Sequence, residues 1–350
     1  MYFLKDKVHE VKSFAVDSGL LYFNTPNYVN EYYSNTRLIN STENLQSLKV
    51  ENNKIIINTN LGVGYFIEGL NVICLKEPIQ YISSDYYITY IRVDAEKNTV
   101  IKDIKQSKKI IDIKYSSTIF LVWYNTYFRY NYHEKTIEAF EFPTATFLWK
   151  YHLIDLGPYI YNDKEQKAYE VRKFLGIYNE RLFVLLSNDE ILVLNMQDGS
   201  MLEKISQTPP QPMGEYTISV LGNCMLLDTE TGKIKGFVNY VYWELDLLTY
   251  QFQCYNLATT LHQNGLIGIM NISSYAQSDM HFIVTMKRID ESGSMWSFLV
   301  AINRNSKSIE WKQELPWTGN NVPQYSDGKL YQLDTNNTLH IFEKQEDHLN

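Results

Sequence analysis

The stretch Asn179–Ile205, NERLFVLLSNDEILVLNMQDGSMLEKI, contains the clearest pattern of strands and turns in the chain. Its apolar runs at Arg181–Leu186 and Ile191–Asn195 are short and separated by polar residues, which is typical of strands. The dipeptide Asp198-Gly199 favours a further turn, because glycine accepts a positive φ and aspartate bonds its own backbone. A third strand follows at the end of the stretch. The sequence here therefore predicts consecutive antiparallel strands.

The same rhythm of apolar runs and polar turns recurs along the chain, where a helical period is hard to find. Similar patterns occupy Tyr86–Ile104, Thr118–Phe142, Val241–Tyr255, Phe298–Leu315 and Gly328–Lys344. The outer hairpin turns lie near residues 96, 134, 198, 247 and 305, so their spacings are roughly 38, 64, 49 and 58 residues. A four-stranded propeller blade takes about 40–50 residues, and loop insertions lengthen it.

These spacings predict an all-β fold, in which residues 1–350 form a single β-propeller of about seven four-stranded blades, with six or eight as alternatives. We expect one blade before residue 80, over Gly19–Leu48. The last unit stops after its third strand, because polar residues follow Phe342. The N-terminal strand within MYFLKDKVHEVKSF is expected to lie beside Thr338–Lys344 and close the ring, which removes free sheet edges.

Three phrases carry a resemblance to a known repeat family: LFVLLSNDEILVLNMQDGSMLEKI, MLLDTETGKIKGF and FLVAINRNSKSIEWKQELP. They resemble the blade pattern of quinoprotein-like propellers, in which an aromatic-rich strand, a D-x-x-T-G type turn and a strand ending in Trp recur. The resemblance covers about half of the chain and concerns the structural repeat, with no active site. WD-repeat and kelch patterns fit less well, because the chain has neither a Trp-Asp nor a Gly-Gly dipeptide.

The resemblance raises the question of a bound quinone with calcium. Such a site needs carboxylate and Asn oxygens that converge on the metal and a basic residue near the cofactor. No such group is identifiable, and we expect no cofactor. Histidine spacings typical of zinc sites and the G-x-S-x-G motif of hydrolases are also missing. We therefore assign no catalytic or metal-binding residue.

Composition narrows the range of partners. The chain has 32 Lys and Arg against 40 Asp and Glu, a net charge of −8, and no basic block. It therefore offers no attraction for nucleic acid or for an anionic membrane. The N-terminal stretch carries charges where an export signal needs an apolar run, and no window approaches the ~18 apolar residues of a spanning helix. We expect a soluble, cytoplasmic protein that is monomeric apart from its partner.

The most suggestive candidates for binding are aromatic. Tyr and Trp give large contact areas and are enriched at interfaces, but the same residues also pack between propeller blades. The residues that we predict to contact a partner are Tyr124, Tyr127, Tyr130, Tyr275 and Trp317. Two candidate loop insertions, Gln207–Glu215 and Asn271–Met280, are expected to form a partner-facing rim.

The sequence thus favours a non-catalytic scaffold for protein–protein interaction. Its acidity favours a basic partner, and one concrete version is an immunity-type protein that neutralises a basic toxin. The alternative is an enzyme or small-ligand binder with a site at the mouth of the central channel, where residues distant in sequence converge. Sequence spacing cannot detect a site of that kind.

Overall fold

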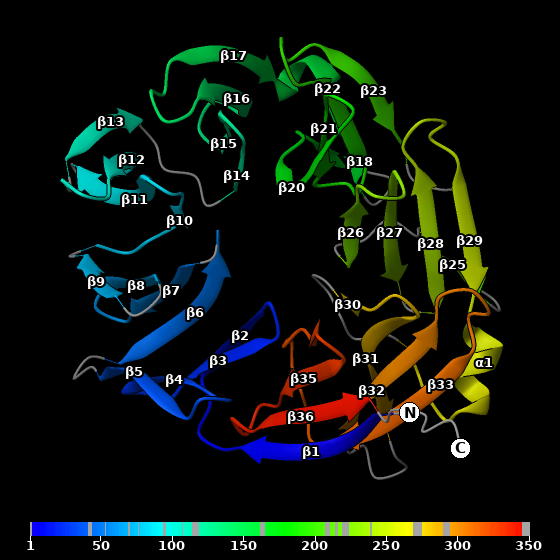
Figure 1. The fold of residues 1–350 in the computed structure, drawn as a ribbon. Helices are drawn as coiled ribbons and strands as arrows, with labels where there is room; N and C mark the ends of the chain where they lie inside the picture. Colours follow the sequence, from blue (N-terminus) through cyan, green and yellow to red (C-terminus); the bar gives the residue numbers. More distant parts are fainter. Residues whose placement is uncertain are drawn as a thin grey trace.

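The strands form eight four-stranded antiparallel sheets arranged in a ring (Figure 1). In this computed structural model, the described residues are 2–40, 44–52, 54–68, 71–75, 77–93, 96–106, 108–113, 119–161, 165–206, 211–213, 216–218, 224–238, 240–268, 275–289 and 295–344. In seven of these sheets the strands pair in chain order and the first strand lies nearest the ring axis, whereas in the eighth the N-terminal strand is the outermost. The fold is a β-propeller of eight blades, which we number from the N-terminus.

The first four blades occupy the N-terminal part of the chain. Blade 1 contains β2 (Ser13–Asp17), β3 (Leu20–Asn24), β4 (Tyr28–Glu31) and β5 (Thr36–Asn40). Blade 2 contains β6 (Leu45–Glu51), β7 (Lys54–Thr59), β8 (Gly64–Glu68) and β9 (Asn71–Leu75). Blade 3 contains β10 (Tyr81–Ile82), β11 (Tyr86–Val93), β12 (Glu96–Asp103) and β13 (Lys109–Ile113). Blade 4 contains β14 (Phe120–Trp123), β15 (Thr126–Asn131), β16 (Thr136–Glu141) and β17 (Phe147–His152).

The other four blades complete the ring. Blade 5 contains β20 (Val171–Tyr178), β21 (Arg181–Leu186), β22 (Ile191–Asn195) and β23 (Met201–Ile205). Blade 6 contains β26 (Met225–Asp228), β27 (Lys233–Val238), β28 (Val241–Asp246) and β29 (Phe252–Asn256). Blade 7 contains β30 (Ala276–Gln277), β31 (His281–Ile289), β32 (Met295–Asn303) and β33 (Ile309–Leu315). Blade 8 contains β34 (Gln324–Ser326), β35 (Lys329–Leu333), β36 (Leu339–Lys344) and β1 (Tyr2–Val8).

The predicted closure of the ring is confirmed. Strand β1 pairs antiparallel with β36, from Tyr2 opposite Lys344 to Val8 opposite Leu339. The two ends of the described chain therefore share one blade, and the last sheet gains its fourth strand.

The count of eight lies within the predicted range. The additional blade comes from the first 80 residues, where the sequence predicted one blade over Gly19–Leu48 and the structure has blades 1 and 2. The predicted segment runs across the boundary between these two blades.

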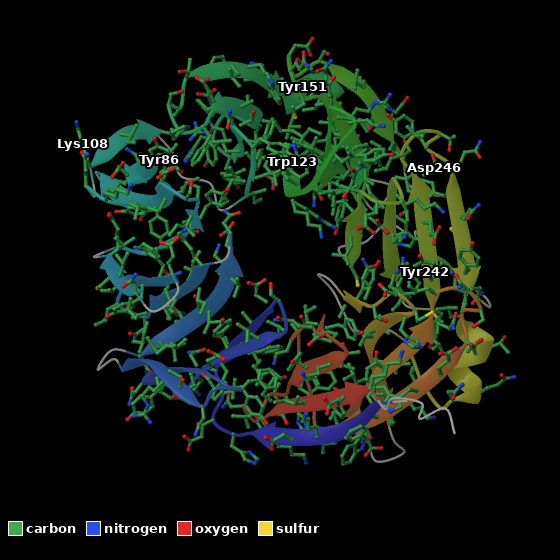
Figure 2. The ribbon with its side chains drawn as sticks, viewed as in Figure 1. Tyr86, Lys108, Trp123, Tyr151, Tyr242 and Asp246 are labelled. Atoms are coloured by element: carbon green, nitrogen blue, oxygen red, sulfur yellow. The ribbon has the colours of Figure 1, made fainter. Side chains whose placement is uncertain are left out.

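The core is divided among the seams between neighbouring blades, where side chains fill the space (Figure 2). Tyr86 packs against the apolar cluster between blades 3 and 4, and Tyr242 lies within the cluster between blades 6 and 7. Trp123 and Tyr151 both pack against the cluster between blades 4 and 5. The second strand of a blade lies between two seams. Strand β21 is therefore apolar on both faces, with Leu182 in one cluster and Phe183 in the next.

Candidate functional site

Strand direction assigns each loop of the propeller to one of two faces. Because the strands of a blade are antiparallel, the turn between its second and third strands lies on the same face as the connection to the next blade. The other two turns lie on the opposite face. Three consecutive connections, residues 153–170, 206–224 and 257–275, are 18 or 19 residues long and follow blades 4, 5 and 6. We call the face that carries them the insertion face.

The first insertion, 153–170, contains the 3₁₀ helix η1 (Leu153–Leu156) and a hairpin of β18 (Tyr159–Tyr161) and β19 (Glu165–Lys167). Leu153 and Tyr169 anchor it, because both are buried in the cluster between blades 4 and 5. Other apolar side chains of the insertion face solvent, with exposed fractions of 79% for Ile154, 59% for Ile160 and 43% for Tyr161.

A pocket of about 560 Å³ lies between this hairpin and blade 5. The hairpin and the turn after β21 supply most of its lining, with further residues from the two ends of blade 5. The lining residues are Tyr159, Ile160, Tyr161, Tyr169, Arg172, Ser187, Asn188, Asp189, Glu190 and Ser206. The volume falls in the range of sites for small molecules or for a few side chains of a partner.

One of the two pocket carboxylates is fully engaged by its neighbours. Glu190 accepts hydrogen bonds from the hydroxyls of Tyr169 (2.9 Å) and Ser206 (3.2 Å), and Lys204 Nζ lies 3.2 Å away. Burial alone would raise the pKa of Glu190, but the hydrogen bonds from Asn188, Tyr169 and Lys204 outweigh it and lower the pKa. Glu190 therefore holds this wall of the pocket together.

The second pocket carboxylate is less well satisfied. Asp189 Oδ1 pairs with Arg172 Nη1, and Oδ2 accepts no hydrogen bond from the described residues. Burial raises the pKa of Asp189 and outweighs the opposing effect of Arg172. Asp189 can therefore accept a further hydrogen bond from a group that enters the pocket.

The third insertion, 257–275, packs closely on the ring. Its helix α1 (Ala258–Gln263) follows Leu257, whose N–H donates to the carbonyl of Tyr240 in a turn of blade 6 (2.7 Å). Leu261 and Tyr275 are buried between blades 6 and 7. This insertion thus contributes to the core as well as to the insertion face.

The predicted rim segment Gln207–Glu215 lies within the second insertion, whereas only residues 271–275 of Asn271–Met280 belong to the third, and the rest forms β30 and the turn after it on the opposite face. Strands β24 (Gln211–Met213) and β25 (Tyr216–Ile218) form a hairpin in the second insertion, while residues 207–210 and 214–215 of the predicted segment lie outside the described part of the chain. Of the segment Asn271–Met280, residues 271–274 also lie outside it. The described remainder begins with the buried Tyr275 and continues into β30.

The structure disperses the five aromatic residues that were predicted to contact a partner. Tyr127, Tyr130 and Tyr275 are buried in three different seams, so their rings stabilise packing between blades and are removed from any partner surface. Tyr124 is 85% exposed in the first turn of blade 4, on the face opposite the insertions. Trp317 is half-buried in the connection between blades 7 and 8, on the insertion face.

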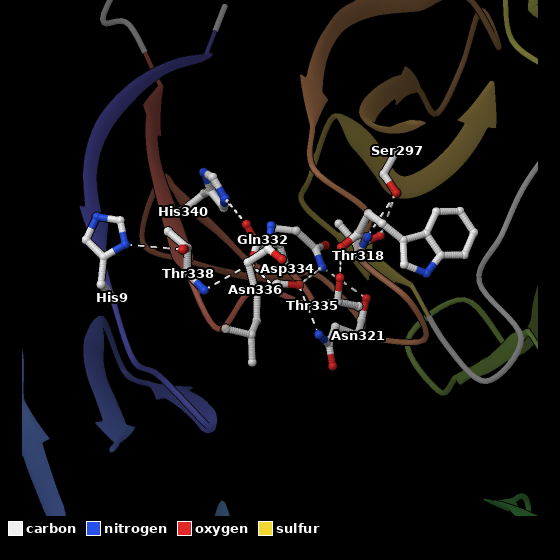
Figure 3. Close-up of polar contacts among 12 residues, drawn as sticks. His9, Ser297, Thr318, Asn321, Gln332, Asp334, Thr335, Asn336, Thr338 and His340 are labelled. Carbon is white, nitrogen blue, oxygen red and sulfur yellow. Dashed lines mark hydrogen bonds and ion pairs between the residues drawn. The ribbon is translucent and has the colours of Figure 1, made fainter. Parts of the chain in front are cut away.

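A polar network on blade 8 fixes the connection that carries Trp317 (Figure 3). The Trp317 carbonyl accepts hydrogen bonds from the N–H (2.8 Å) and the hydroxyl (2.9 Å) of Thr335. The neighbouring Asp334 accepts from the N–H of Thr338 (2.9 Å), and its Oδ2 lies 2.9 Å from Nε2 of the buried His340. Burial lowers the pKa of His340 and outweighs the opposing effect of Asp334. This network holds the backbone of the connection in place.

Sequence reasoning missed the residues around the pocket, among them Tyr159, Ile160, Tyr161 and Asp189. One signal pointed to them, because the largest predicted turn spacing, roughly 64 residues between residues 134 and 198, spans the first insertion. Within the described residues, no group of three or more His, Cys, Asp or Glu side chains could hold a metal ion. No helix there has the length and apolar character that crossing a bilayer requires.

Comparisons with known proteins show the fold alone. No protein-family model matches the chain, and no curated protein does. Among solved structures, BamB from Moraxella catarrhalis is 11% identical with a TM-score of 0.58, and the match covers 100% of both chains. Sqt1 from Saccharomyces cerevisiae is 10% identical with a TM-score of 0.58, over 99% of this chain and 98% of the other. The computationally designed protein Ika8 is 11% identical with a TM-score of 0.55, over 96% of each chain. These matches confirm a resemblance to known β-propellers in structure only.

Proposed function

We propose that this chain is a non-catalytic scaffold for protein–protein interaction and that it binds its partner through the insertion face of blades 4 to 7. One observation carries the proposal: three consecutive connections between blades are long, whereas those elsewhere in the ring have between four and eight residues. Loops held by a rigid scaffold are where binding residues concentrate. The exposed Ile154, Ile160 and Tyr161 are the kind of residues that become buried in an interface.

The charge of the chain supports a basic partner. A net charge of −8 speeds encounter with a positively charged surface and disfavours encounter with an acidic one. The narrower form of the proposal is an immunity-type protein that binds a basic toxin, such as a nuclease, in the cytoplasm. Association would then slow as salt is added, since screening weakens the attraction.

A binding site for a small ligand, or an enzyme site, is the second candidate. The pocket favours it, because Arg172 lies on β20, the strand of blade 5 nearest the ring axis, and pairs with Asp189 at the pocket wall. Native mass spectrometry of the chain, incubated with a small-molecule extract of its source cells, tests this candidate. A ligand bound by the wild type and lost from Asp189→Asn would support it, whereas a spectrum with no bound mass would exclude it.

The main proposal is tested by affinity capture from a lysate of the source organism with quantitative mass spectrometry. The double variant Ile160→Ser/Tyr161→Ser removes exposed apolar surface from the first insertion. Two matched controls are Leu61→Ser and Leu248→Ser, whose side chains are 72% and 61% exposed. Leu61 lies on the insertion face of blade 2, and Leu248 lies on the opposite face of blade 6.

We expect a partner present in stoichiometric amount to fall at least about tenfold in the double variant, as loss of an interface anchor of about 1.4 kcal/mol implies. The two controls should retain it within about twofold. Equal losses in all three variants, or the absence of any stoichiometric partner, would contradict the proposal.

A further inference from the structure

Strand β18 is an edge strand with one partner. Its residues pair only with β19, from Tyr159 opposite Lys167 to Tyr161 opposite Glu165. Among the described residues no third strand joins this sheet. The N–H and C=O groups on the outer side of β18 therefore form no ladder, and such an edge is a template for another strand. A two-stranded hairpin is also only marginally stable without a further strand or covering surface.

The pocket lies along β18 and away from β19. All three residues of β18 line it, and no residue of β19 does. The turn of residues 187–190 also lines the pocket and is held by backbone hydrogen bonds. The Leu186 N–H donates to the Glu190 carbonyl (2.8 Å), and the Ser187 N–H donates to the Glu170 carbonyl (2.8 Å). The three residues of β18 and this preformed turn thus line one pocket of about 560 Å³.

Charges around the pocket favour one kind of side chain. Lys204 is neutralised by Glu190, and Arg172 is occupied by Asp189 Oδ1. Asp189 Oδ2 accepts no hydrogen bond from the described residues and is the remaining acceptor for a cation or an N–H donor. An ammonium or guanidinium group in the pocket would also meet the ring of Tyr159, which attracts cations, whereas the ring of Tyr161 already carries Lys167 Nζ at 3.6 Å from its centroid.

We propose that an extended segment of the protein partner binds in this pocket by adding a third strand to the edge of β18, with a lysine or arginine side chain directed at Asp189. Main-chain hydrogen bonds to β18 supply affinity, and the contact with Asp189 supplies selectivity. Since β18 has three residues, about three residues of the segment pair with it, a length of about 10 Å. This inference rests on the proposed function and names the chemistry of the partner.

The test uses peptides in place of the unknown partner. Phage-displayed random dodecapeptides are selected on the full chain, with Ile160→Ser/Tyr161→Ser as counter-selection, and an enriched peptide is synthesised. Each of its amides is then N-methylated in turn, and affinity is measured by fluorescence anisotropy. In an added strand, alternate N–H groups point at the neighbouring strand. We therefore expect methylation at every second paired residue to weaken binding about tenfold or more, and methylation at the residues between to change it less than about twofold.

The selectivity step has its own test. Asp189→Asn is a mild change, because asparagine also tolerates the left-handed backbone (φ 65°) of this position. It should weaken binding of a peptide with lysine or arginine about tenfold and leave a norleucine version unchanged. Glu203→Gln, an exposed acid on β23 of the same blade, should leave both peptides unaffected.

Two results would overturn strand addition: selection that enriches no peptide dependent on Ile160 and Tyr161, and binding that tolerates N-methylation at every position. If N-methylation is tolerated at every position while lysate capture still depends on Ile160 and Tyr161, the proposed interaction face is retained and only the proposed mode of binding is wrong. If lysate capture shows no partner, the proposed function itself fails.

Discussion

The two halves of the ring share one blade design but differ in how the blades are joined. Connections in the half that contains blades 8, 1, 2 and 3 have between four and eight residues, whereas the three connections that join blades 4 to 7 have 18 or 19. The seams next to the long connections also contain more buried apolar residues than the other seams. Among the described residues, the seams joined by insertions contain 14, 11 and 13 buried apolar residues, and every other seam contains six to eight.

The larger seams arise because the insertions themselves contribute buried residues to the core. Leu153 and Tyr169 of the first insertion, and Leu257, Leu261 and Tyr275 of the third, add to the seams beneath them. An anchored insertion loses little conformational entropy when a partner binds. The apolar side chains that anchoring leaves exposed, such as Ile160, are then available for contact.

The largest expected effect comes from the buried ion pair of blade 4. Arg129 Nη2 lies 2.6 Å from Glu138 Oε2, both side chains are buried, and Asn131 and Thr136 donate to Oε1 at 3.0 Å. Arg129→Met leaves an uncompensated buried carboxylate, so we expect a loss of about 3–5 kcal/mol in the free energy of unfolding, measured with urea. Lys5→Met, which breaks the exposed pair of Lys5 with Glu343 on blade 8, should leave the urea midpoint almost unchanged.

The double variant Arg129→Met/Glu138→Leu distinguishes the loss of the ion pair from a loss of packing. Because it removes both charges, it should recover much of the lost stability. If the single and double variants are equally unstable, the loss comes from packing and the ion pair is unimportant.

The next effect tests whether the third insertion is core. Leu261→Ala in α1 removes a buried side chain between blades 6 and 7 and should cost about 2–5 kcal/mol in the free energy of unfolding. Leu61→Ala, in the short turn of blade 2, should change it by no more than about 0.5 kcal/mol, because its side chain faces solvent. If both variants change the free energy of unfolding by equally small amounts, the third insertion only covers a core that is complete without it. The two halves of the ring would then not differ in how their connections contribute to the core.

The repeat could be predicted from sequence because local signals carry it. Strands predicted at Arg181–Leu186 and Ile191–Asn195 are β21 and β22. The N-terminal strand was predictable because the last unit lacked its fourth strand.

Which aromatic residues face a partner could not be predicted. Alternation assigns a strand one buried and one exposed face, but the second strand of a blade lies between two seams and is covered on both. Tyr127 and Tyr130 lie on β15, a second strand, and both are buried despite their odd spacing. The pocket could not be predicted either, because it depends on how the hairpin at Tyr159 lies against the turn at Asp189.

The smallest expected effect concerns the closing blade, in the half of the ring without insertions. His340 on β36 is buried beside Asp334, and Lys7 and His9 of the N-terminal segment act on it as nearby charges. Burial lowers the pKa of His340 below its ordinary value of about 6.5. The unfolded chain therefore binds a proton at His340 more tightly than the folded chain does. Its contribution to stability is therefore present above about pH 6.5 and is lost as the pH falls through the lower pKa of the folded state.

We expect the wild type to lose more stability between pH 7.5 and pH 5.5 than His340→Gln, which keeps a neutral donor for Asp334 but does not titrate. Urea unfolding at closely spaced pH values measures the free energy of unfolding of both proteins. The difference between these two free energies should narrow steadily as the pH falls. The carboxylates with lowered pKa, such as Asp228 at about 2, titrate below this window and affect both proteins alike. Parallel curves for the two proteins would show that protonation of His340 does not oppose closure of the ring.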